Sequence, residues 1–374
     1  MSHNRFSSVD WCHTANIYEV NLRQYTPEGS FNAFAKELPR LRDMGIDILW
    51  FMPITPIATE KRKGSLGSYY ACSDFTSTNP EYGTLADFKA LVQTAHQLGF
   101  KVIIDWVANH TGWGHSWTHT NPDYFKRNEA GEFYDSHGWD DVIDLDFQNQ
   151  AMRLDLIEAM RFWIRECEID GFRCDMAMLV PLDFWIQART ALDAEKKLFW
   201  LAECEEAPYH QAFDVTYTWE WMHKTFEFVN HHQQIHHLDQ LLEKYTHQFP
   251  PGAIRLFFTS NHDENSWNGT EFEKYGEAHK PLAVFSAMWN GMPLIYSGQE
   301  LPSRKRLMFF DKDPIEWTGD CAYHGFYKTL LNLRKTHSAL RAGGQEPNTR
   351  RLHTDANQHI FGFTRSSEGE EVLV

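Results

Sequence analysis

Ile169-Asp170-Gly171-Phe172-Arg173-Cys174-Asp175-Met176 carries the clearest structural signal in the chain. It predicts a short buried strand from Ile169 to Cys174, followed at once by an exposed carboxylate. Arg173 and Asp175 are two residues apart, so on an extended strand both side chains point to the same side. A guanidinium in this place favours the ionised carboxylate and lowers the pKa of Asp175. The pattern fits a nucleophile and equally fits a structural ion pair.

Two other stretches, 198–203 and 256–263, repeat this design of an apolar run that ends in a carboxylate. Apolar runs of this kind are typical of the buried strands of parallel sheets. Between them lie segments with apolar residues at helical spacing. The predicted strands span 15–22, 46–52, 101–105, 169–174, 198–202, 213–217, 254–259 and 293–296, and the predicted helices span 31–44, 84–98, 150–167, 181–194, 219–248, 278–290 and 323–340.

Eight predicted strands, seven of them followed by a predicted helix, predict an α/β fold, a (β/α)8 TIM barrel. The runner-up is a doubly wound open sheet, which is expected to carry a glycine-rich phosphate turn; the sequence has neither GxGxxG nor GxxxxGK[ST]. We assign the barrel to residues 11–342. Residues 110–145 lack periodicity and predict a small loop-rich subdomain inserted after the third strand. Residues 343–374 predict a short β segment, the start of a C-terminal β domain, with a hairpin formed by 358–365 and 371–374.

The composition of the chain limits the binding partners and the cell compartment that we expect for the protein. The net charge of −16 argues against nucleic acids and anionic membranes as partners. No apolar run approaches the roughly 20 residues that span a membrane. The six cysteines are scattered without CxxC spacing, and the N-terminus lacks a signal-peptide pattern. These features predict a cytoplasmic protein; a mature exported chain would look the same.

In a barrel of this kind, residues just past the strand ends gather at one mouth. We expect Asp105, Asp175, Glu203, Asp263, His110, His262 and Arg173 there. Such a set suits either hydrolysis with a divalent metal or glycoside cleavage by two carboxylates. The sequence has no HExxH motif and no HxH after the first strand, which disfavours the metal reaction.

Glycoside cleavage explains the two central carboxylates better. Asp175 and Glu203 follow adjacent strands, and a retaining enzyme needs its two carboxyl groups about 5–5.5 Å apart. Arg173 favours an ionised Asp175, whereas the apolar residues 199–202 before Glu203 favour its protonated form. Two carboxylates in opposite environments predict a nucleophile and an acid/base.

Four segments, in order, resemble the α-amylase family of retaining glycoside hydrolases and transglycosidases (glycoside hydrolase family 13). They are Asp105-Trp106-Val107-Ala108-Asn109-His110, Gly171-Phe172-Arg173-Cys174-Asp175, Leu201-Ala202-Glu203 and Ser260-Asn261-His262-Asp263. Residues 50–54, 79–84 and 291–300 add supporting likenesses. The resemblance covers nearly the whole chain.

The resemblance implies a role for each site residue. Asp175 would be the nucleophile, Glu203 the acid/base and Asp263 the carboxylate that stabilises the transition state. Tyr70, His110, Arg173 and His262 would bind the substrate, with Tyr70 stacking on the sugar that is cleaved; its neighbour Tyr69 is a competing choice.

The implied activity is cleavage of α-1,4-glucosidic bonds in starch-type glucans or maltooligosaccharides through a covalent glycosyl-enzyme. Two alternatives use the same machinery: an α-glucan transglycosidase and an α-glucosidase. A third is a non-catalytic amylase-like binding module, which the presence of all three carboxylates disfavours.

One segment departs from the family pattern. Many starch-cleaving members have Ala-x-Lys-His after the nucleophile, where this chain has Met176-Ala177-Met178-Leu179. The lysine and histidine that help to bind the leaving group and a calcium ion are therefore absent. Asn109 and Asp144 still offer the oxygen ligands that calcium prefers, and we retain them as candidate calcium ligands. No organic cofactor is expected.

Overall fold

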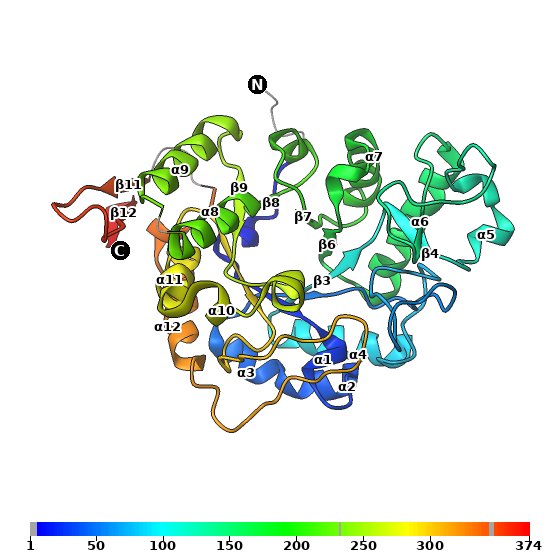
Figure 1. The fold of residues 1–374 in the computed structure, drawn as a ribbon, viewed down its shortest axis with the longest axis horizontal. Helices are drawn as coiled ribbons and strands as arrows, with labels where there is room; N and C mark the ends of the chain where they lie inside the picture. The colour runs from blue at the N-terminus through cyan, green and yellow to red at the C-terminus, as the bar shows by residue number, and fades with distance from the viewer. Residues whose placement is uncertain (1–5, 232, 344–347) are drawn as a thin grey trace.

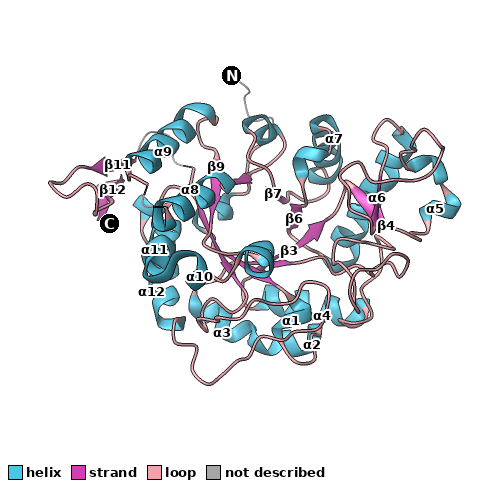
Figure 2. Ribbon diagram, in the orientation of Figure 1, coloured by secondary structure: helices cyan, strands magenta, loops and turns pink. Residues whose placement is uncertain are grey.

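The computed structural model describes residues 6–231, 233–343 and 348–374. Its centre is a closed parallel barrel with the strand order β1-β10-β9-β8-β7-β6-β3-β2 (Figures 1 and 2). The predicted (β/α)8 barrel is confirmed. The strands are β1 (Ile17–Val20), β2 (Ile48–Phe51), β3 (Lys101–Trp106), β6 (Gly171–Cys174), β7 (Phe199–Ala202), β8 (Val215–Tyr217), β9 (Ile254–Phe257) and β10 (Met292–Tyr296).

Side chains alternate between the inside of the barrel and the layer under the helices. In β2, Ile48 and Trp50 join the cluster that fills the barrel, together with Ile103 and Leu201. Leu49 and its outward-facing counterparts on the other strands pack against the helices instead. This alternation follows from the two-residue period of a strand, and it explains why most strand residues are apolar on both faces.

The helices cover the outside of the barrel. They are α1 (Leu22–Tyr25), α2 (Phe31–Phe34), α3 (Leu38–Met44), α4 (Leu85–Gln97), α6 (Gln150–Cys167), α7 (Leu182–Asp193), α8 (Trp219–Asn230), α9 (His236–Gln248), α10 (Glu271–Tyr275), α11 (His279–Met288) and α12 (His324–Thr336). The predicted helix 31–44 is divided into α2 and α3 by a 3₁₀ turn. Among the described residues, no helix combines the length and the apolar character needed to cross a bilayer.

The prediction of a single helix over 219–248 is wrong, because the segment forms two helices, α8 and α9. A straight helix of that size would be about 45 Å long. The break lets Trp221 of α8 and Leu238 and Leu241 of α9 reach one shared apolar cluster. Burial of both apolar faces against the same side of the barrel therefore outweighs the continuity of the helix.

The inserted segment and the C-terminal strands lie on opposite sides of the barrel (Figure 1). The inserted segment contains the antiparallel pair β4 (His110–Gly112) and β5 (Val142–Asp144) and the short helix α5 (Trp117–Thr120). At the other side, β12 (Gly362–Ser367) and β13 (Glu370–Leu373) form the hairpin, and β11 (Thr349–Leu352) adds a third strand that the sequence did not predict.

The C-terminal sheet is fixed to the barrel by apolar and polar contacts. Phe363 packs with Phe285 and Leu340. The buried guanidinium of Arg365 donates hydrogen bonds to the carbonyls of Leu340 and Arg341. Two strands alone are marginally stable, so the third strand and this docking account for the order of the segment.

Candidate active site

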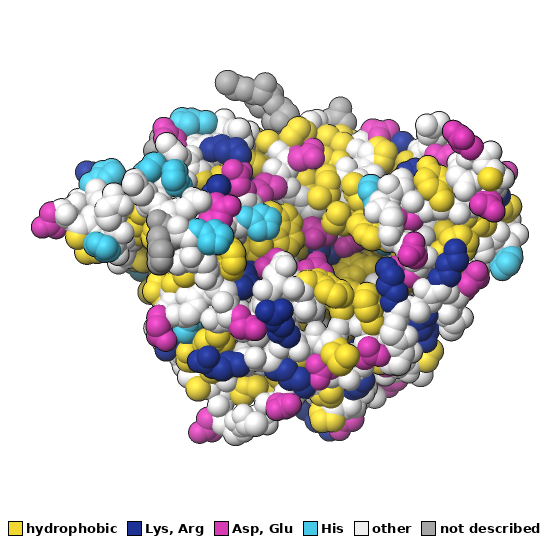
Figure 3. All heavy atoms as spheres, in the orientation of Figure 1, with side chains coloured by type: hydrophobic (Ala, Val, Ile, Leu, Met, Phe, Trp, Pro, Cys, Tyr) yellow, Lys and Arg dark blue, Asp and Glu magenta, His cyan; other side chains and the backbone are white. Residues whose placement is uncertain are grey.

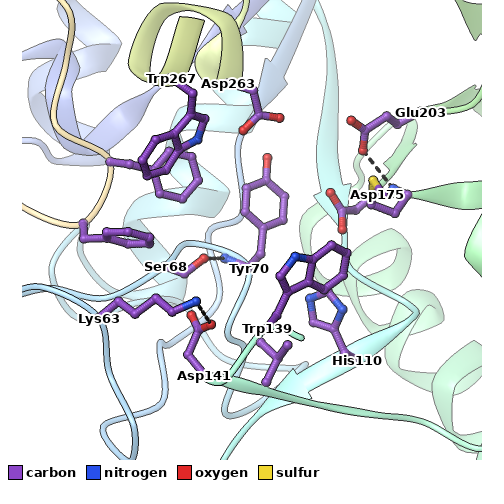
Figure 4. Close-up of a pocket in the computed structure, with 14 residues that line it drawn as sticks. Lys63, Ser68, Tyr70, His110, Trp139, Asp141, Asp175, Glu203, Asp263 and Trp267 are labelled. Carbon is purple, nitrogen blue, oxygen red and sulfur yellow. Dashed lines mark hydrogen bonds and ion pairs between the residues drawn. The ribbon is translucent and has the colours of Figure 1, made fainter. Parts of the chain in front are cut away.

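A pocket of about 520 Å³ opens at the carboxyl ends of the strands (Figure 4). Figure 3 shows acidic side chains on the floor of a hollow near the centre of this face, with hydrophobic side chains around it. The pocket is lined by Lys63, Ser68, Tyr70, His110, Trp139, Asp141, Val142, Asp175, Met176, Glu203, Asp263, Trp267, Phe309 and Phe310. Five of the seven residues predicted to bind or cleave substrate are thus in its wall, and the other two, Arg173 and His262, lie directly behind it.

Arg173 is the centre of the site. Its fully buried guanidinium contacts three carboxylates: Nη1 lies 2.9 Å from Asp105 Oδ1 and 2.9 Å from Asp175 Oδ1, and Nη2 lies 2.8 Å from Glu203 Oε2. Strand register produces this arrangement, because Arg173 is paired with Asp105 across β3 and β6. Across β6 and β7, Cys174 is paired with Ala202, which places Asp175 and Glu203 side by side at the strand ends.

The pKa of Asp175 differs from the sequence-based expectation. Burial raises it well above the usual range of an aspartate, the Glu203 carboxylate raises it further, and Arg173 opposes both. The predicted lowering is wrong because burial and Glu203 outweigh Arg173, which also contacts two other acids. Burial likewise raises the pKa of Asp105 to about 6, again against the effect of Arg173. The site therefore holds more negative charge than its one buried guanidinium balances.

Glu203 is also held differently from the expectation. Its carboxylate does not lie among the apolar side chains that precede it in sequence, because those alternate between the barrel interior and the layer under the helices. Instead, Oε2 contacts Arg173 and accepts a hydrogen bond from the backbone N–H of Met176 at 2.8 Å. Met176 has a positive φ of 39°, an uncommon conformation for a residue with a Cβ. Strained backbone of this kind is often found at functional sites, and here the N–H of the strained residue binds Glu203.

Asp263 is the most open of the three carboxylates, with 37 % of its side chain exposed against 8 % for Asp175 and 5 % for Glu203. Its neighbour His262 is buried and lies between Tyr70, whose hydroxyl is 2.7 Å from Nε2, and Glu19, which contacts Nδ1. Burial alone would lower the pKa of His262, but Asp263 and Glu19 outweigh it and raise the pKa to about 9. His262 is therefore a cation at neutral pH.

The pKa of His110 is shifted in the opposite direction from that of His262. Burial lowers its pKa to about 4, against the weaker effects of Asp144 and Asp141. At neutral pH it is an uncharged imidazole. The side-chain amide of Asn109 lies 3.2 Å from its Nδ1, which leaves Nε2 as the hydrogen-bond donor if the amide donates. Trp139 packs edge-on against the ring at 5.5 Å.

Several pocket residues were not found from the sequence. Glu19, which holds His262, is a charged residue within the apolar strand β1, and that anomaly was a usable signal. Lys63 and Asp141, joined at 2.7 Å, lie in loops without a motif, as do Trp139 and Phe309 of the aromatic wall, whereas Trp267 lies in the short helix Glu264–Asn268. Only the fold brings these loops to the barrel mouth.

Of the candidate calcium ligands, Asp144 lies in the inserted segment and Asn109 immediately precedes it. Asp144 is fully buried, and its Oδ2 accepts hydrogen bonds from Ser136 and from Lys126 Nζ, the latter at 2.9 Å. The carboxyl group of Asp135 lies within hydrogen-bonding reach of Asp144. The Oδ1 atoms of Asp135 and Asp144 are both buried without a hydrogen-bond partner.

These residues supply the oxygen donors that calcium prefers, but they supply too few of them. Calcium takes six to eight oxygen ligands. Here two carboxylate oxygens are free, Asn109 could add its amide oxygen because only its amide nitrogen contacts His110, and the ammonium of Lys126 already neutralises Asp144. Among the described residues, no group of three or more His, Cys, Asp or Glu side chains could hold a metal ion.

Comparison with known proteins shows the family of the chain. A family model for the catalytic domain of alpha amylase matches residues 5–138 and 123–316. The structure superposes on an alpha-amylase from Lactobacillus plantarum with a TM-score of 0.89 at 32 % identity, covering 97 % of this chain and 88 % of that one. For a noncanonic maltogenic alpha-amylase, AmyB from Thermotoga neapolitana, the TM-score is 0.89 at 31 % identity, covering 96 % and 85 %.

Curated relatives are longer. The alpha-amylase MalA of Haloarcula japonica is 24 % identical over 390 residues, which span 99 % of this chain and 56 % of that protein. Alpha-amylase 2 of Dictyoglomus thermophilum is 25 % identical over 390 residues, which span 96 % of this chain and 65 % of that protein. The chain thus spans somewhat more than half of the length of these relatives. The family match, the barrel and the arrangement of carboxylates around Arg173 lead to one conclusion: this chain belongs to the α-amylase family.

Proposed function

We propose that this chain hydrolyses α-1,4-glucosidic bonds of starch-type glucans or maltooligosaccharides with retention of configuration. The observation that carries the proposal is the pair Asp175 and Glu203, which contact one guanidinium from adjacent strand ends and both line the pocket. A retaining glycosidase needs two carboxyl groups this close, because one of them must reach the anomeric carbon directly.

Each residue has a defined part in the reaction. Asp175 attacks the anomeric carbon and forms the covalent glycosyl-enzyme. Glu203 gives its proton to the departing oxygen, then takes a proton from the water that releases the sugar. Arg173 stays charged throughout, and its contacts fix both carboxylates. Asp263, together with the cationic His262, faces the sugar hydroxyls, and neutral His110 donates a hydrogen bond from the opposite wall.

Two sister activities compete with hydrolysis of long glucans. Transglycosidases and α-glucosidases can use the same three carboxylates, and one relative, 24 % identical over 207 residues, is named oligo-1,6-glucosidase. Digestion of maltoheptaose with analysis of the products distinguishes them. Hydrolysis yields only shorter oligosaccharides, whereas transfer also yields longer ones. A chain that is folded and leaves maltoheptaose intact would refute the proposal.

The variant Glu203→Gln tests the covalent step. It removes the acid and the base but leaves Asp175 free to attack a glycosyl fluoride, whose leaving group needs no proton. The glycosyl-enzyme is expected to accumulate on Asp175. Azide, a nucleophile that needs no base, is expected to release it as a glycosyl azide with the configuration of the substrate. An azide of inverted configuration would rule out the retaining mechanism.

We also propose that calcium, for which Asn109 and Asp144 are the candidate ligands, binds weakly and serves structure alone. Lys126 supplies positive charge beside Asp144, which supports this view, and the unpartnered Oδ1 atoms of Asp135 and Asp144 are where an ion would bind. EDTA is expected to lower the melting temperature of the wild-type protein by a small amount that added calcium restores.

For the compartment, we propose the cytoplasm. All six cysteines are free thiols, five of them buried and Cys321 half-buried, which supports a reducing environment. Fractionation of the source cells with an antibody against the chain tests this.

A further inference from the structure

The ion pair between Lys63 and Asp141 joins two loops across the pocket. Lys63 lies in the loop between β2 and α4, which also carries Tyr70, and Asp141 immediately precedes β5 of the inserted segment. Lys63 Nζ is 2.7 Å from Asp141 Oδ1. Asp141 is buried, while 38 % of the Lys63 side chain is exposed. We call this contact the Lys63–Asp141 bridge.

The position of the bridge relative to Glu203 indicates which end of the substrate lies near the bridge. Figure 4 shows the bridge and Glu203 at opposite ends of the pocket, with Tyr70 between them. Under the proposed function, Glu203 protonates the oxygen on the anomeric carbon, C1, of the sugar held at Tyr70. In a glucopyranose ring, C4 lies opposite C1. The chain that continues from O4 toward the non-reducing end therefore runs toward the bridge.

The hydrogen-bonding groups of the bridge suit the free non-reducing end of a glucan better than a sugar within the glucan. A free 4-hydroxyl can donate to the Asp141 carboxylate and accept from the Lys63 ammonium, whereas an O4 that links two sugars can only accept. A linked O4 also carries another glucose, which has to pass the loops that the bridge joins.

Aromatic side chains line the pocket beside the bridge. Phe309 packs parallel to Tyr70 at 6.3 Å, and Trp267 packs against Phe309 at 5.2 Å, so one side is a continuous aromatic surface. Trp139, packed on His110, forms the opposite side. Sugars stack on such faces, and the bridge lies beyond Tyr70 from Glu203 (Figure 4).

We propose that the Lys63–Asp141 bridge closes the non-reducing-end side of the pocket, so that the protein removes short units from free chain ends and does not cut within a long glucan. The proposal rests on the function proposed above and deepens it, because it makes these two residues determinants of the cleavage position.

A pair of substrates tests the bridge. Both are maltoheptaose labelled at the reducing end, and one has its non-reducing end blocked by a 4,6-O-benzylidene group. We expect wild-type protein to cleave the open substrate at least about tenfold faster than the blocked one. Lys63→Ala is expected to raise the relative rate on the blocked substrate by about tenfold, because the wall is opened.

Two further variants complete the design. Asp141→Asn keeps the size of the side chain and removes its charge, and it is expected to shift the ratio in the same direction. Lys61→Ala is the matched control: Lys61 is in the same loop, but its ammonium lies over Trp113, outside the pocket, at 3.3 Å. It is expected to leave the ratio unchanged, and melting curves check that all variants are folded.

The outcomes are separable. Equal cleavage of the open and blocked substrates by the wild type, or an unchanged ratio in both bridge variants, overturns the role of the bridge while leaving the proposed function in place. A folded wild type that cleaves neither substrate overturns the proposed function, and the role of the bridge with it.

Discussion

Two buried groups of carboxylates, one at the barrel mouth and one in the inserted segment, have opposite electrostatic characters. At the mouth, Asp175 shares Arg173 with two other acids, and burial raises its pKa well above the usual range. In the inserted segment, burial acts on Asp144 in the same direction, yet the hydrogen bond from Ser136 and the ammonium of Lys126 outweigh it and lower its pKa.

The difference shows what separates a reactive carboxylate from a structural one. Both are buried beside a cation. Asp144 has a lysine and a serine hydroxyl as donors of its own, so its charged form is stabilised and it holds the segment together. Asp175 shares one guanidinium and faces an open pocket, so its charged form is incompletely stabilised in the free protein. Such incompletely balanced sites are where ligands and reactions gain free energy.

The largest effect is expected from Asp175→Asn. It removes the nucleophile and should lower the rate of hydrolysis by about 10⁴–10⁶-fold. The free energy of unfolding at pH 7 should stay the same or rise, because a carboxyl group whose pKa is raised in the folded state costs stability when it ionises. Activity assays and urea unfolding measure both effects. Substantial remaining turnover would exclude Asp175 as the nucleophile.

Asp144→Asn is the same chemical change in the other region, and the opposite result is expected. Activity should remain within about tenfold of wild type, while the free energy of unfolding at pH 7 falls by about 1–3 kcal/mol. A group whose pKa is lowered by folding stabilises the protein above its unfolded-state pKa, and this contribution is lost as the pH falls. The stability difference from wild type should therefore shrink in acid; a difference independent of pH would contradict this account.

Lys126→Met sharpens the comparison by removing the cation instead of the acid. Asp135 and Asp144 would then lack a positive neighbour, and we expect a loss of about 1–2 kcal/mol, less than for a fully buried pair because Lys126 is partly exposed. Millimolar calcium should raise the melting temperature of this variant part of the way to the wild-type value, and it should raise the melting temperature of the wild type much less. Equal responses to calcium in both proteins would show that Lys126 does not substitute for a metal ion.

Glu19→Gln is expected to have the smallest effect. His262 has a raised pKa of about 9, and Glu19 is one cause of the rise. The stability that this histidine contributes is complete below its unfolded value of about 6.5 and is lost as the pH rises through about 9. Without Glu19, the alkaline limb of the kcat/KM profile should move to lower pH by about one unit. An unmoved limb in a folded variant would mean that another group controls it.

Local sequence signals were sufficient for much of the fold and for the main site residues. Apolar runs that end in carboxylates placed Asp175, Glu203 and Asp263 correctly at the barrel mouth, because strand ends always converge there. The signals failed where packing between residues far apart in the sequence determines the local structure. The polar segment 219–248 has a continuous helical pattern, yet it folds back on itself to bury two apolar faces.

The sequence by itself determined the barrel, the order of its strands and the identity of its catalytic candidates, since these depend on hydrophobic period and motif. Only the tertiary structure decided the charges and the shape of the site. Glu19 holds His262 across 243 positions of sequence, Arg173 is divided among three acids, and Lys63 meets Asp141 between two loops. A pKa or a pocket wall depends on neighbours in space, and those neighbours are fixed only when the barrel closes.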